Sequence, residues 1–141
     1  MTISMWAQDR LYLAVLYGDA PTDEEWDRWV TMSVERSGRD QRVIVESHNS
    51  GPNAKQRKEL ADAVRDVELR VAVLTDSAVV RGIVTALAWL GVPQRAFPIG
   101  GYWQAANYLE LVPAELDRAL EELPRLRAEA GFHVLKKASS G

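Results

Sequence analysis

The segment Glu46–Asn53 (ESHNSGPN) combines residue types that could bind an anion or take part in catalysis. Its polar candidates for binding are His48, Asn49, Ser50 and Asn53. The segment follows Arg42–Ser47, a short apolar run that predicts a strand, and ligands favour the carboxyl ends of parallel strands. A helix that begins behind the segment would offer free N–H groups to an anion. The simpler interpretation is that Asn53 and Gln56 form a capping box.

A second polar segment, Thr75–Ser77, follows the next predicted strand, Leu69–Thr75. Asp76 and Ser77 are both good helix N-caps, and capping is again the simpler interpretation. Arg81 lies one helical turn later and could pair with Asp76 or face an anionic ligand. Phosphate on Ser77 would lie at a helix N-terminus, where negative charge is tolerated, although Asp76 would oppose it.

The residues required by most catalytic and metal sites are scarce. The chain has no cysteine and two histidines, His48 and His133, without metal-ligand spacing. A Ser–His–Asp set could combine Ser47 or Ser50 with His48 and Asp76, but no nucleophile-elbow motif accompanies them. We therefore expect no enzymatic activity, no metal and no cofactor. A hydrolase that uses His48 is the weakest alternative.

Length and charge predict one small globular domain. The chain has 141 residues, 47% of them hydrophobic, and a net charge of −3 with both signs interspersed. This balance gives no reason to expect nucleic acid or a membrane surface as a partner. No signal peptide or membrane-spanning run is recognisable, so a cytoplasmic location is expected. We assign 1–135 to the domain and 136–141 to a flexible tail.

The apolar pattern predicts an α/β fold. Two strands joined by a turn near residues 8–10 come first. Three helices then alternate with three more strands, and two further helices follow. Such an order implies a mainly parallel sheet with helices packed on it, while the first strand runs antiparallel. Gly38 is expected to end the first helix.

Helical spacing predicts which side chains are buried. The first helix would bury Trp26, Trp29, Val30 and Val34. The helix Val79–Leu90 has a broad apolar face, which predicts burial on more than one side. The last helix would bury Leu116, Leu120, Leu123 and Leu126, and would point Arg118, Arg125 and Arg127 to solvent. Pro124 is expected to kink or split it, and Trp103 beside a double glycine is a candidate contact residue.

The segment Arg70–Leu111 resembles the STAS-domain superfamily, particularly its SpoIIAA-like branch. The similar features are a strand at Arg70–Asp76, a helix that opens near Arg81, a strand that ends at Phe97 and a short helix at Ala106–Leu109. The resemblance implies a regulatory switch that acts through protein contacts, in which a serine at a helix start is phosphorylated.

Two serines compete for that role. Asp76–Ser77 is locally similar to the switch motif, whereas the order of the elements favours Ser50, so both serines stay candidates. The SpoIIAA-like resemblance also implies an apolar crevice for lipid-like ligands.

These observations give two function hypotheses. The first is a non-enzymatic STAS-like regulatory or scaffolding domain, which binds a protein partner through His48–Asn53 and Thr75–Ser77. The alternative is a sensor or carrier of a small apolar ligand, in a crevice between the helix Val79–Leu90 and Trp103. A homodimer through an exposed helix or edge strand is a further option.

Overall fold

The computed structural model describes residues 3–35, 40–48 and 51–130, and it confirms the predicted α/β fold. Gly38, Asn49, Ser50, His133 and the predicted tail 136–141 lie outside the described residues. The strands are β1 (Ile3–Gln8), β2 (Leu11–Leu16), β3 (Gln41–Ser47), β4 (Leu69–Leu74) and β5 (Gln94–Phe97). The helices are α1 (Asp23–Glu35), α2 (Ala54–Ala63), α3 (Ala78–Trp89), α4 (Tyr102–Leu109) and α5 (Pro113–Glu129).

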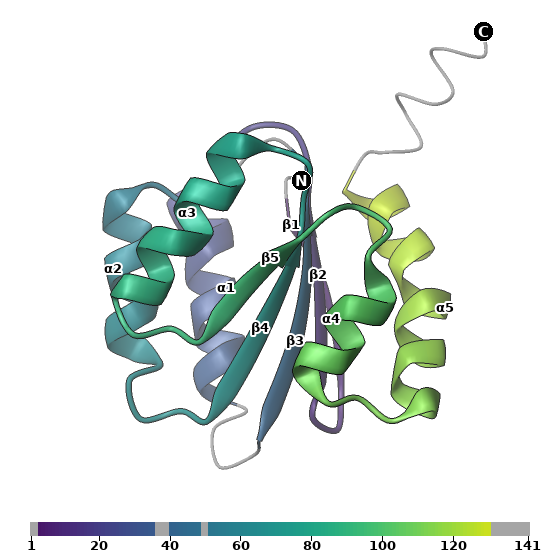
Figure 1. Ribbon diagram of the computed structural model, residues 1–141. Helices are drawn as coiled ribbons and strands as arrows, with labels where there is room; N and C mark the ends of the chain where they lie inside the picture. Colours follow the sequence, from purple (N-terminus) through teal and green to yellow (C-terminus); the bar gives the residue numbers. More distant parts are fainter. Residues whose placement is uncertain (1–2, 36–39, 49–50, 131–141) are drawn as a thin grey trace, which may run out of the picture.

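The five strands form one sheet in the order β1-β2-β3-β4-β5. β1 and β2 are antiparallel and are joined through Asp9 and Arg10, where Asp9 adopts a left-handed φ of 54°. All other neighbours are parallel. Helices α1, α2 and α3 cover one face of the sheet, and α4 and α5 cover the other (Figure 1). The sheet is therefore enclosed on both sides, as the apolar strands predict.

Local capping signals fix the helix starts at the predicted positions. Thr22 and Glu25 form a reciprocal capping box before α1, because each side chain bonds to the backbone N–H of the other residue. Asn53 and Gln56 form the same arrangement at α2. Ser77 caps α3 by accepting a hydrogen bond from the Val80 N–H. These contacts satisfy backbone donors that would otherwise be unpaired.

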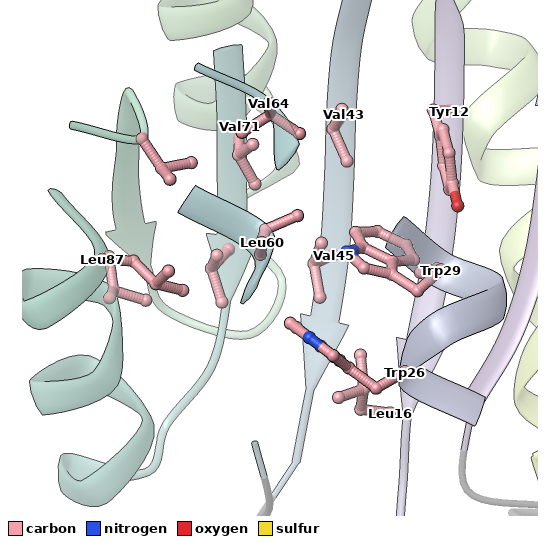
Figure 2. Packing of buried hydrophobic residues seen from close by; sticks show 14 of the residues in the cluster. Tyr12, Leu16, Trp26, Trp29, Val43, Val45, Leu60, Val64, Val71 and Leu87 are labelled. Atoms are coloured by element: carbon pink, nitrogen blue, oxygen red, sulfur yellow. The ribbon is translucent and has the colours of Figure 1, made fainter. Parts of the chain in front are cut away.

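Side-chain alternation along the strands divides the core between the two faces. β2 is buried along its whole length. Its Tyr12, Ala14 and Leu16 face α1, α2 and α3, whereas Leu11, Leu13 and Val15 face α4 and α5. The cluster on the α1–α3 face also contains two tryptophans from α1, and its side chains point toward one another across the space between sheet and helices (Figure 2).

The helices differ in how closely they approach the sheet. α4 and α5 approach the strands closely, because Ala105 and Ala119 are fully buried against them. α1 and α2 approach the strands at few points, and the large side chains of Trp26, Trp29 and Leu60 fill the wider gap. Bulky side chains at a wide spacing pack less completely than alanines at a close one.

Four apolar residues are more exposed than their helical spacing predicted. They are Val34, Val79, Leu90 and Leu120. Ser33 is buried beside the exposed Val34, and Ala119 is buried beside the exposed Leu120. α3 is therefore buried on one side only, through Val80, Val84 and Leu87.

Of the two outcomes expected at Pro124, a split of the last helix is wrong, since α5 continues from Pro113 to Glu129, while a kink stays a prediction. Because Pro124 has no backbone N–H, the carbonyl of Leu120 has no helical hydrogen-bond donor. The side chain of Leu120 lies on the exposed side of the helix.

Candidate functional site

A buried carboxylate at the end of the central strand is the centre of a polar cluster of four side chains. Glu46 of β3 is 1% exposed. Arg127 binds it with both arms of its guanidinium, since Nε lies 2.7 Å from Oε1 and Nη2 lies 2.8 Å from Oε2. The Tyr102 hydroxyl donates to Oε2 at 3.0 Å, and His48 Nε2 lies 2.7 Å from Oε1. Both carboxylate oxygens are therefore fully engaged.

These contacts hold Glu46 in its charged form. Burial alone would raise the pKa of Glu46, but the hydrogen bonds from His48 and Arg127 outweigh it and lower the pKa to about 2. Burial and the nearby carboxylate raise the pKa of Tyr102 to about 12, so its hydroxyl stays protonated. The bond to Glu46 raises the pKa of Arg127 above its ordinary value. At neutral pH the cluster is a charged pair with a neutral tyrosine donor.

The cluster joins three elements that are far apart in the sequence. Alternation along β3 places Glu46 on the face covered by α4 and α5. Tyr102 is the first residue of α4, and Arg127 lies in the last turn of α5. The prediction that Arg127 points to solvent is therefore wrong, because its side chain crosses to a buried counter-charge. Charge-assisted, bidentate pairs of this type give strong positional restraint.

The cluster does not resemble a general-base site. A general base needs a lone pair that can accept the substrate proton, and its pKa is best placed near the working pH. Glu46 meets neither requirement, because its oxygens are engaged and its pKa lies near 2. We interpret the cluster as a structural lock between the sheet and the helices α4 and α5.

The predicted binding residues are divided among separate structural roles. His48 contacts Glu46, and Asn53 caps α2. Ser77 caps α3, and Asp76 Oδ1 accepts a hydrogen bond from the Ile99 N–H at 3.1 Å. His48 and Asp76 therefore have different partners, which gives no support to a triad. Ser50, the other candidate for phosphorylation, lies outside the described residues.

The two remaining candidates are exposed on helices that cover opposite faces of the sheet. Arg81 lies on α3, and Trp103 lies on α4 with 74% of its surface exposed. A crevice between α3 and Trp103 is therefore excluded, since the sheet separates α3 from α4 (Figure 1).

An apolar cavity of about 70 Å³ lies instead between the sheet and α1, α2 and α3. Val80, Ile83, Val84 and Leu87 of α3 form one wall. Val43, Val45, Val71 and Val73 of the central strands form the floor, and Trp26 and Trp29 of α1 form a further wall. This cavity lies beside α3, as the predicted crevice does, but its lining includes Trp26 and Trp29 of α1 and not Trp103.

Two residues that line this cavity each contain a buried polar atom without a hydrogen-bond partner in the described structure. The two atoms are the indole N–H of Trp29 and the side-chain carbonyl of Gln41. The Trp29 nitrogen lies within the apolar cluster in Figure 2. Unpaired buried polar groups are rare in native proteins, because each costs roughly 1–3 kcal/mol. This makes the cavity the better candidate for a ligand site.

Sequence reasoning did not find these functional candidates. Trp29 was predicted as a core residue, and Gln41 was placed just outside its strand. Tyr102 and Arg127 had no local signal, because their partner Glu46 is 56 and 81 residues away, respectively. A buried glutamate at the end of an apolar strand is the one signal that could have indicated a distant cation.

No match to a known protein guides the interpretation. Comparison with protein-family models, with curated proteins and with solved structures found no match to this chain. The resemblance to STAS domains therefore stays a prediction. Among the described residues, no group of three histidine, aspartate or glutamate side chains is arranged to hold a metal ion. None of the described helices has the length and hydropathy to cross a membrane.

Proposed function

We propose that this chain is a non-catalytic binding domain, whose cavity between the sheet and α1–α3 takes up a small, mainly apolar molecule. The observation that carries the proposal is an apolar cavity lined by two residues that contain unpaired buried polar atoms, Trp29 Nε1 and Gln41 Oε1. A ligand that paired with either atom would recover part of the cost of burying it. A regulatory or sensor role agrees with this proposal, because a bound ligand would stabilise the packing of α1, α2 and α3 on the sheet.

The size of the cavity restricts what it can bind. An engineered cavity of about 150 Å³ holds one benzene molecule. A cavity of about 70 Å³ is roughly half as large, and therefore suits a xenon atom or a ligand of about three or four non-hydrogen atoms. Larger ligands would require α1 or α3 to move away from the sheet.

Xenon is expected to bind in this cavity and to shift the methyl resonances that line it. The measurement is a series of ¹H–¹³C NMR spectra under xenon pressure, in which Val45, Val73 and Val84 should respond. Val84→Phe should abolish the response by filling the space, while Val79→Phe on the exposed side of α3 should leave it unchanged. Val84→Ile, which adds one methylene, should weaken it if Val84→Phe does not fold.

An absence of xenon shifts in the folded wild-type protein would contradict the proposal. Equal responses in Val84→Phe and Val79→Phe would contradict it as well, because they would place the xenon elsewhere.

Protein contact through exposed aromatic residues is a second candidate function. Trp103 on α4 is 74% exposed and Trp89 at the end of α3 is 85% exposed. Exposed tryptophans are common anchors of protein interfaces, since each buries a large apolar area on contact. This candidate retains the regulatory or scaffolding hypothesis and moves the contact surface from the loops to the helices.

If Trp103 supports association between copies of the chain, the sedimentation coefficient of the wild type should rise with concentration. Trp103→Ser should remove that rise, while Leu120→Ser, which also removes an exposed apolar side chain, should retain it. A concentration-independent coefficient that corresponds to a monomer of 15.8 kDa would contradict a homodimer.

A further inference from the structure

The polar atoms around the cavity identify the kind of ligand that it can hold. Most of them are already paired. Trp26 Nε1 donates to the Gln56 carbonyl, Ser33 Oγ donates to the Trp29 carbonyl, and the amide nitrogen of Gln94 donates to the Val84 carbonyl. The amide nitrogen of Gln41 donates to the Ser33 carbonyl at 2.9 Å.

Two fully buried polar atoms of the described lining residues remain unpaired, and one is a donor while the other is an acceptor. Trp29 Nε1 is a hydrogen-bond donor without an acceptor, and Gln41 Oε1 is an acceptor without a donor. Both side chains are buried, with Gln41 1% exposed, and both line the same cavity. Ser33 connects them, because its side chain bonds to the Trp29 backbone while its carbonyl holds the Gln41 amide.

Charge is excluded from the cavity by its lining. Within the described part of the chain, no lysine, arginine, histidine, aspartate or glutamate lines it. An ionised ligand would lose its hydration without gaining a counter-charge, which is strongly unfavourable. Carboxylates, phosphates and ammonium groups therefore do not suit this site.

We infer that the cavity selects a neutral molecule with a hydroxyl group, namely a short-chain alcohol. This inference rests on the proposed function. A hydroxyl accepts one hydrogen bond and donates another, so it matches both the Trp29 donor and the Gln41 acceptor. The apolar remainder of the alcohol packs against the valines of β3 and β4. A ligand of four non-hydrogen atoms has limited contact area, and dissociation constants in the millimolar range are expected.

The test compares four probes that each have four non-hydrogen atoms. They are 1-propanol, methoxyethane, n-butane and acetate. The readout is the indole N–H resonance of Trp29 in ¹H–¹⁵N NMR spectra, assigned by its loss in Trp29→Phe. We expect 1-propanol to shift this resonance and to bind about threefold to tenfold more tightly than methoxyethane or butane. Acetate should not bind.

Variants at two glutamines identify the atom responsible. Gln41→Met should remove the preference for 1-propanol over methoxyethane without weakening butane binding. Gln94→Met is the matched control, since Gln94 lines the same cavity and should leave the preference intact. Because Gln41 also holds the Ser33 carbonyl, Trp29→Phe is the second variant, and its binding is read from the methyl resonances of Val45, Val73 and Val84. It should reduce the affinity for 1-propanol and methoxyethane but not for butane.

The outcomes distinguish this inference from the function on which it rests. Butane that binds as tightly as 1-propanol would overturn hydroxyl selection, while the proposed apolar site would stand. Acetate that competes with 1-propanol would overturn the exclusion of charge. If neither xenon nor any of the four probes binds, the cavity holds only water, and both proposals fail.

Discussion

Replacement of Arg127 by alanine is expected to lower the free energy of unfolding by about 3 kcal/mol. Glu46 would remain buried while its bidentate partner is lost. We place the expected loss at the lower end of the range for broken buried pairs, because the Arg127 side chain is partly exposed and its removal admits water to the carboxylate. Since domains of this size are stable by about 5–15 kcal/mol, the loss is large. Urea unfolding followed by tryptophan fluorescence measures it.

Matched variants separate the buried pair from general effects on the helix. Arg125→Ala removes a nearby arginine of the same helix, which is itself exposed and pairs with Glu122 and Glu129, and should change stability little. The double variant Glu46→Gln with Arg127→Met should recover part of the loss, because it removes both charges together. If Arg127→Ala and Arg125→Ala were equally stable, the cluster would not act as a lock.

Acid is expected to destabilise the protein as the pH falls from about 4.5 toward 2. The folded-state pKa of Glu46 is lowered from 4.5 to about 2, so its contribution is complete above the unfolded pKa and is lost as the pH approaches the folded pKa. At about 1.4 kcal/mol for each pKa unit, this contribution is about 3 kcal/mol. Unfolding free energies measured by urea titration at several pH values test it.

The Glu46→Gln variant isolates this contribution from those of other carboxylates. Its unfolding free energy should be lower at neutral pH and should fall less steeply than that of the wild type below pH 4.5. Glu115, whose pKa is lowered by its hydrogen bond from Arg10, contributes in the same direction, so Glu115→Gln is the appropriate comparison. Identical slopes for the wild type and Glu46→Gln would contradict the ionised, hydrogen-bonded state of Glu46.

The elements of the fold could be predicted because their signals are local. The run Leu11–Tyr17 is apolar without interruption, and Leu11–Leu16 within it form a strand buried on both faces. The spacings Thr22–Glu25 and Asn53–Gln56 place reciprocal acceptors at two helix starts. In each case the residues that determine the structure lie within a few positions of one another, so their physical chemistry can be read from the chain directly.

The tertiary pairings could not be predicted because the same local patterns are compatible with several partners. Arg127 adjoins Leu126 at the border of the buried stripe, where a long side chain can turn either toward solvent or toward a buried charge. Ala119 and Leu120 are neighbours, and only the close approach of α5 to β2 selects the smaller one for the core. The cavity depends on the spacing between the layers, which no single segment determines.

The cavity makes the α1–α3 side of the sheet more compressible than the α4–α5 side. Hydrostatic pressure favours states in which internal voids are eliminated. The α4–α5 side, closed by buried alanines, offers little volume to lose, whereas the α1–α3 side contains the cavity. Water driven inward by pressure would therefore enter beneath α1 and α3 first, and the polar atoms of Trp29 and Gln41 would receive it.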